Sequence, residues 1–191
     1  MDKLGLENLI FNIQYAIIIE FEVNGHMSRA EKLDFDHIVK DILTNEEFKK
    51  LDTELHHGIT RYNHSLRVAK ATYKCAKALK LDYKEATRAA LMHDFYINEQ
   101  FEGTPASKVL SKHPDQAALN SKKHFNISEL QENIIRSHMF PMSKEMPKFK
   151  ESWVVTAVDK SVAAYEMYRF KASLYVSIFA IFIFNLITMQ R

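Results

Sequence analysis

The chain has 191 residues, of which 47% are hydrophobic and 26% charged, and this composition excludes an intrinsically disordered protein. Its 26 basic and 24 acidic residues leave a net charge of +2, so no nucleic-acid partner is expected. A single cysteine excludes a disulfide framework and a paired-cysteine zinc module, and it is typical of a reducing compartment, the cytoplasm. Nine histidines against one cysteine need an explanation.

The first part of the chain, residues 1–43, is predicted to be a helical extension. Leu9, Ile13 and Ala16 follow one another at helical spacing and indicate an amphipathic helix packed on the body. A short second helix is expected from Leu33 to Leu43.

The body, residues 44–170, is predicted to be one all-α domain, because few glycines or prolines interrupt it and strand-type alternation is missing. A capping box in residues 44–47 predicts a helix that runs to about His57 and stops at Gly58. The next helix is expected from Thr60 or Arg61 to about Lys80.

Further helices are expected along the rest of the body. Asp82 opens one that runs through Asp94, and residues 98–112 form a loop at the substrate entrance. Pro114 is expected as the first residue of the next helix. Ser128 opens another that ends near His138, and the last long helix runs from about residue 149 past residue 168.

The C-terminal segment, residues 171–191, is predicted to be a hydrophobic helix. Residues 172–190 carry no charge and span roughly 28 Å as a helix, close to the roughly 30 Å of a hydrocarbon core. As a membrane tail, flanked by Arg169 and Lys171, it would hold the domain on the cytoplasmic face. As a final core helix it would be buried, and Asn185 and Thr188 keep that alternative open.

Two histidines and two aspartates occupy predicted helix faces that are otherwise apolar. His64 shares its face with small apolar residues, and His93 and Asp94 end an alanine-rich helix. Asp159 lies among valines. A buried carboxylate beside an imidazole is costly unless a positive group pairs with it, and a divalent metal ion is an economical partner.

In order along the chain, His64, the doublet His93-Asp94 and Asp159 resemble the HD-domain metal-dependent phosphohydrolase superfamily over about residues 55–168. The resemblance implies an HD-type helical bundle in which these four residues bind a divalent ion. Nitrogen and oxygen ligands suit Mn, Fe, Co, Ni, Zn or Mg.

His113 and His138 lie between the doublet and Asp159. Some branches of the superfamily, including hydrolases of dinucleoside polyphosphates, place two further histidines there and bind two ions, with the aspartate equivalent to Asp94 as the bridge. Alternatively, His113 and His138 are ordinary residues at helix ends.

Basic side chains near these ligands are candidates for binding phosphate. Arg61 precedes His64 by almost one turn, and Lys160 follows Asp159 directly. Arg67 falls on the solvated side of its predicted helix and is not a candidate. His56 and His57 are either close to the metal or a surface pair.

These observations predict a phosphohydrolase in which Asp94, Lys160 and Arg61 take part in catalysis on a small phosphorylated, nucleotide-type substrate. The alternative is a non-catalytic module that binds metal and phosphate and is tethered through its C-terminal helix. The sequence indicates no oligomeric state.

Overall fold

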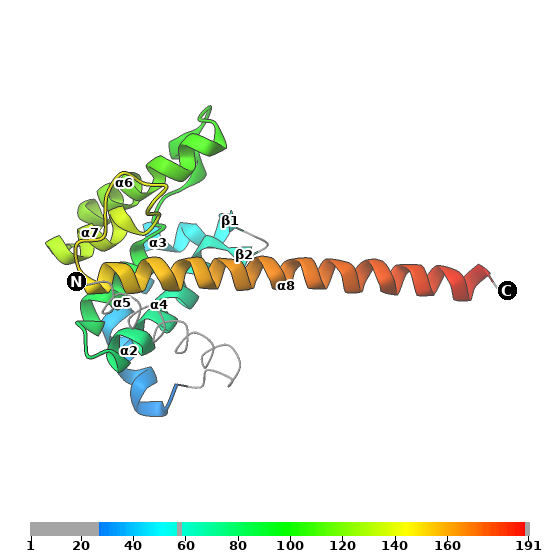
Figure 1. Cartoon of the computed structure of the whole chain (residues 1–191), viewed down its shortest axis with the longest axis horizontal. Coiled ribbons are helices and arrows are strands. Elements are labelled where there is room, and N and C mark those ends of the chain that lie inside the picture. The colour runs from blue at the N-terminus through cyan, green and yellow to red at the C-terminus, as the bar shows by residue number, and fades with distance from the viewer. Residues whose placement is uncertain (1–26, 57–58, 190–191) are drawn as a thin grey trace.

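The computed structural model describes residues 27–56 and 59–189, with the backbone alone at His56 and beyond Lys171. The N-terminal amphipathic helix expected within residues 1–26 and the helix stop at Gly58 lie outside these residues. Apart from one short hairpin, the described chain is helical, which confirms the all-α class (Figure 1). The elements are α2 (Arg29–Thr44), α3 (Glu46–Lys49), η1 (Lys50–Thr53), β1 (Leu55–His56), β2 (Ile59–Thr60), α4 (Arg61–Ala78), α5 (Tyr83–Met92), η2 (Asn98–Phe101), α6 (Ala106–His124), α7 (Glu129–Ser137) and α8 (Lys150–Met189).

Side-chain caps set the starts of the central helices. Thr60 caps α4, Asp82 accepts from the backbone N–H of Glu85 at the start of α5, and Ser128 forms a capping box with Gln131 at the start of α7. Each cap satisfies a backbone N–H that has no partner within its helix. The predicted starts of these three helices are therefore confirmed.

The helix predicted from residue 44 to His57 is wrong in its length. Asn45, rather than Thr44, is its cap, and α3 ends at Lys49 and tightens into the 3₁₀ turn η1. Leu55 and His56 then pair with Thr60 and Ile59 in an antiparallel hairpin. The chain therefore leaves the helix before the hairpin begins, and the cap predicted the start of this helix but not its end.

The expected loop over residues 98–112 is also shorter than predicted. After the 3₁₀ turn η2, helix α6 begins at Ala106 behind Pro105, and Pro114 lies inside it. His113 is therefore within a helix rather than at its start. Pro114 is buried, although a proline inside a helix cannot donate a backbone hydrogen bond.

Helix α8 runs without a break from Lys150 to Met189, so no separate helix begins at residue 171. Neither Pro nor Gly occurs in this range, and its second half projects beyond the other helices (Figure 1). Among the described residues, no helix combines the length and the apolar character that a membrane span requires. The side chains of the proposed tail, residues 172–190, lie outside the described part.

The core forms where α4, α5, α7 and α8 meet. Helix α4 packs against α5 and α8, and α7 packs against α5, α6 and α8. Small buried residues such as Ala69, Ala89 and Ala90 let the helices approach closely. This packing brings the start of α4, the ends of α5 and α7, and the first half of α8 to one place.

Candidate metal centre

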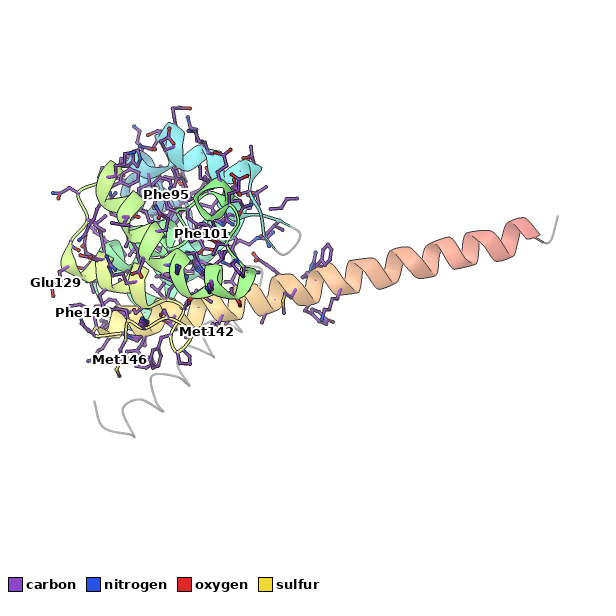
Figure 2. All side chains as sticks on the ribbon, turned by 90° about the horizontal axis from the view of Figure 1, so that it is seen from above. Phe95, Phe101, Glu129, Met142, Met146 and Phe149 are labelled. Carbon is purple, nitrogen blue, oxygen red and sulfur yellow. The ribbon has the colours of Figure 1, made fainter. Side chains whose placement is uncertain are left out.

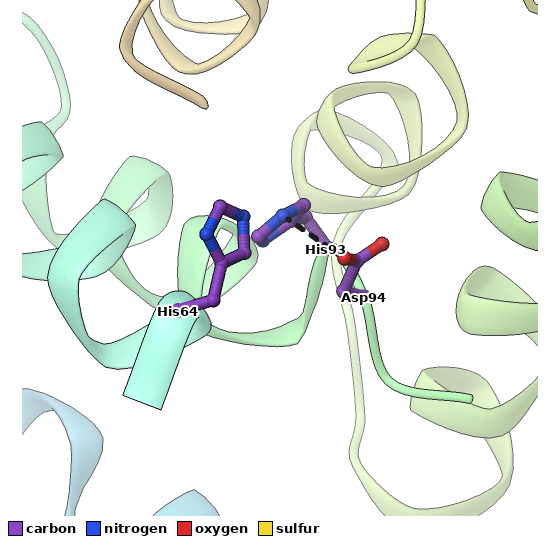
Figure 3. A group of neighbouring side chains, drawn as sticks. All are labelled: His64, His93 and Asp94. Atoms are coloured by element: carbon purple, nitrogen blue, oxygen red, sulfur yellow. Dashed lines mark ion pairs between the residues drawn. The ribbon is translucent and has the colours of Figure 1, made fainter. Parts of the chain in front are cut away.

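Four histidines and two aspartates from five helices meet in one buried cluster, and all are 6% exposed or less. His64 comes from α4, and Figure 3 shows its ring beside that of His93 at the end of α5, with Asp94 next to it. The remaining members come from α6, the end of α7, and α8. The cluster consists of His64, His93, Asp94, His113, His138 and Asp159.

All four imidazole rings are held in place through their Nδ1 atoms. His93 Nδ1 lies 2.7 Å from the carbonyl of Ala90, and His138 Nδ1 lies 2.7 Å from that of Ile135. His113 Nδ1 is 3.1 Å from the carbonyl of residue 109, and His64 Nδ1 is 2.8 Å from the carboxylate of Glu166. Since these oxygens only accept, each Nδ1 carries the proton. Each Nε2 is therefore the atom that faces the cluster.

Asp159 forms one side of the cluster. Its Oδ1 atom lies 3.1 Å from His64 Nε2 and 3.4 Å from His93 Nε2. One carboxylate oxygen therefore faces two imidazole nitrogens, which is the environment that a first-row divalent ion uses.

Asp94 lies between two groups of histidines. Its Oδ2 atom is 3.7 Å from His93 Nε2, whereas Oδ1 is 3.2 Å from His113 Nε2 and 3.7 Å from His138 Nε2. His113 Nε2 and His138 Nε2 are themselves 3.0 Å apart. With both Nδ1 atoms protonated, two lone pairs at that distance repel unless a cation or a proton lies between them.

The donor set fits a divalent ion. His93 Nε2 and Asp94 Oδ1 are buried without a hydrogen-bond partner, and leaving buried polar atoms without a partner is costly. A cation bound between them would satisfy both atoms. Three overlapping groups have all their ligand atoms within 4.8 Å of one another: His64, His93 and Asp94; His93, His138 and Asp159; Asp94, His113 and His138.

Burial and charge pull the pKa values of the cluster apart. Burial alone lowers the pKa of His64, but hydrogen bonds to Asp159 and Glu166 outweigh it and raise this pKa to about 10. Burial and the positive charge of His93 and His113 lower the pKa of His138 to about 3. When no metal ion is bound, protonated imidazole rings such as that of His64 supply the positive charge that balances the carboxylates.

The two carboxylates of the cluster are ionised at neutral pH. Burial raises the pKa of Asp94, but the charges on His93 and His113 outweigh it and hold this pKa well below its usual range. Burial also raises the pKa of Asp159, but the hydrogen bond from His64 and the charge on His93 outweigh it and hold this pKa well below its usual range. The centre thus keeps two negative charges available to a cation.

Sequence reasoning missed one member of the site, Glu166. It is 2% exposed, and besides His64 it contacts Arg67, whose Nη1 lies 3.0 Å from Glu166 Oε1. Arg67 is half exposed, as its helical position predicted, and still reaches this carboxylate. The signal was in the sequence, because Glu166 follows Asp159 by seven residues and so lies two turns along the same face of α8.

The two basic residues predicted to contact phosphate, Lys160 and Arg61, differ in their surroundings in the structure. Lys160 is exposed beside the cluster, and its ammonium group donates to the carbonyl of His138 at 3.1 Å. Arg61 is buried, and its guanidinium group donates to the carbonyl of Tyr96 at 2.9 Å and to Asn98 at 3.1 Å, while stacking on the Tyr96 ring. Arg61 thus supports the segment after Asp94. His57 and the side chain of His56 lie outside the described residues.

Comparison with known proteins gives one family. A family model described as HD domain matches residues 61–164, more than half of the chain. The match includes all six residues of the cluster and ends before Glu166. No curated protein and no solved structure matches the chain.

Proposed function

The chain belongs to the HD domain family, and we propose that it is a metal-dependent phosphohydrolase. HD domains are generally metal-dependent hydrolases. The proposed reaction is the hydrolysis of a phosphate ester or anhydride in a small, nucleotide-type molecule. The observation that carries the proposal is the convergence of four anchored Nε2 atoms on two buried carboxylates.

We infer two metal positions that share Asp94, as in the two-metal branches of the superfamily. One would use His64, His93 and Asp159 with Asp94, and the other His113 and His138 with Asp94. The support is the placement of the two Asp94 oxygens, of which Oδ2 faces His93 and Oδ1 faces His113 and His138. The short distance between the two Nε2 atoms of His113 and His138 also favours a cation there.

Each residue has a defined part in this proposal. When bound, divalent ions supply a water of lowered pKa and positive charge opposite the phosphoryl oxygens. Asp94 and Asp159 hold the ions with their negative charge, and the ammonium group of Lys160 is placed to pair with a phosphate oxygen. Arg61 fixes Tyr96, which lines the same side of the site.

An anaerobic metal count combined with a substrate screen tests the proposal. The full chain is expected to retain one or two ions and to release phosphate from a nucleotide panel. The Asp94→Asn variant should lose both the metal and the activity. Asp36→Asn, which changes an exposed aspartate on α2, is the matched control and should change neither.

Two results would contradict parts of the proposal. Unchanged metal content and activity in Asp94→Asn would exclude the assigned centre, and bound metal without turnover on any phosphate compound would favour a non-catalytic binding module. His113→Ala and His138→Ala test the number of ions. Each should reduce a count of two to about one, whereas an unchanged count would exclude the second position.

A further inference from the structure

Resting on the proposed function, we propose that the substrate is a phosphate monoester with one phosphate group, whose remaining part is small and held by apolar contacts. The site for that part is a cavity of about 310 Å³ beside the metal centre. Residues of the centre form its inner wall, namely Asp94, His113, His138 and Asp159. A phosphate at the centre therefore directs its ester group into this cavity.

The outer walls of the cavity are mainly aliphatic. Leu110 comes from α6, Met139 and Met142 from the segment after α7, and Met167 from α8. Ala163 and Ala164 of α8 complete the wall. Methionine side chains are flexible and polarisable, so they adapt to apolar ligands of different shape. A ligand group would therefore be bound in proportion to the apolar surface that it buries against this wall.

Three of these large side chains stay exposed at the mouth of the cavity. Leu110 is 50% exposed, Met142 53% and Met167 42%, although they come from three separate parts of the chain. A contiguous group of exposed apolar side chains marks a binding surface, whereas isolated ones are ordinary. Their shared location around one opening above the metal ligands favours an apolar ligand group at this point.

The charges of the cavity favour a single phosphate. Among the described residues that line it, Lys160 is the one lysine or arginine. Arg61, the other candidate, uses its Nη atoms on Tyr96, Asn98 and Glu54. A second or third phosphate would enter a mainly aliphatic cavity in which Lys160 is the one basic side chain among the described lining residues, and burying charge that has no further cationic partner is costly.

The lining also offers few groups that would identify a nucleobase, chiefly Tyr96 and Lys160. Of its described residues, none is Asn, Gln, Ser or Thr, so the edge of a base would find few side-chain hydrogen-bond partners. Discrimination between ligands that differ by one polar group requires such partners. Among nucleotides, the cavity therefore fits monophosphates and selects little between bases.

A series of alkylphosphonates tests the cavity apart from turnover, because phosphonates are not hydrolysed. Binding of methyl-, butyl- and hexylphosphonate to the metal-loaded full chain is measured by calorimetry. Affinity should rise about two- to fourfold per methylene until the cavity is filled. Met142→Ser and Met167→Ser should flatten this dependence.

The matched control is Met146→Ser. Met146 is 57% exposed in the same segment as Met142 but lies outside the cavity lining, and Figure 2 labels both. This variant should keep the chain-length dependence of the wild type.

Two outcomes would overturn the inference: affinity that does not depend on chain length, or nucleoside di- and triphosphates cleaved more than tenfold faster than alkyl monophosphates. If phosphate esters are cleaved but the phosphonate series is flat, the hydrolase stands and this inference fails. If the series binds as expected and no phosphate compound is cleaved, the proposed function fails and the apolar cavity stands.

Discussion

Glu166 provides a sharp test of how the metal centre is held together. Its Oε2 atom accepts from Nδ1 of His64 at 2.8 Å, and its Oε1 atom accepts from Arg67 at 3.0 Å. The carboxylate is buried, so the imidazole ring of His64 and the guanidinium group of Arg67 offset the cost of burying its charge. Through this contact, His64 is fixed with Nε2 toward Asp159.

The magnitude follows from the contacts that are lost. A hydrogen bond to a charged group contributes about 1.5–3 kcal/mol, and partners that orient metal-bound histidines change metal affinity about 10- to 100-fold. Glu166→Ala removes the acceptor and should weaken metal binding by about that factor. In Glu166→Gln an amide oxygen still accepts from His64, so the loss should be roughly 3- to 10-fold.

Metal affinity is measured by competition with a fluorescent chelator, and the stability of the metal-free protein by urea unfolding. Glu151→Gln is the control, because Glu151 lies on the same helix and accepts from the backbone of Asp82, away from the centre. A purely structural role would lower stability in both Glu166 variants without changing metal affinity in the folded protein. Metal affinity of Glu166→Ala within twofold of the wild type would show that Glu166 does not orient His64 for metal binding.

Three further predictions concern stability. Stripping metal with a chelator should lower the melting temperature by about 5–10 °C, since an ion at 100 times its dissociation constant adds about 2.7 kcal/mol, and no shift on chelation would contradict a bound ion. Asn133→Ala should lower the free energy of unfolding in urea by about 2–3 kcal/mol. The Asn133 side chain accepts from the backbone N–H of Lys148 at 2.9 Å and from the Ser152 hydroxyl at 2.8 Å, and the alanine leaves both donors without this acceptor. A loss below about 0.5 kcal/mol would show that water takes the place of the Asn133 side chain. Hydrogen bonds from Arg88 hold the pKa of Asp41 below its usual value, so this pair stabilises the fold above the unfolded pKa of about 3.9, and the contribution is lost as the pH falls through the lower folded value. Asp41→Asn should therefore cost roughly 0.5–1 kcal/mol at pH 7, a small value because the Asp41 side chain is exposed to solvent, and the difference from the wild type should shrink below about pH 4; a difference independent of pH would contradict the assignment.

Helix starts could be predicted from the sequence because they depend on neighbouring residues. Asp82 and Ser128 each cap a helix within three positions, so the signal is contained in a few residues. No comparable signal marks the end of α3, which tightens at Lys49 into the 3₁₀ turn η1. Helix α6 includes Pro114 in its interior, although a proline is typical of the first turn of a helix.

The same distinction applies to the centre. The order of His64, His93, Asp94 and Asp159 indicated one cluster, since each falls on an apolar helix face. The partners of Arg61 lie 35 and 37 residues away, at Tyr96 and Asn98, and nothing near Arg61 in the sequence points to them. The apolar cavity likewise combines side chains from three separate segments, and only the fold brings them together.

The ligands His93 and His138 show how local and long-range effects combine. His93 and His138 are each the first residue beyond a helix, and each ring donates Nδ1–H to the carbonyl three residues earlier. Carbonyls in the last turn of a helix have no partner within it, so ending α5 and α7 at these residues itself provides the acceptor. The tautomer of both rings is thus set by where two helices stop. The distance between the rings, 4.9 Å between centroids, is set by the packing of α5 against α7. A substitution elsewhere that extends either helix would therefore remove the carbonyl acceptor of the histidine ring and change its tautomer, although the histidine itself is unchanged.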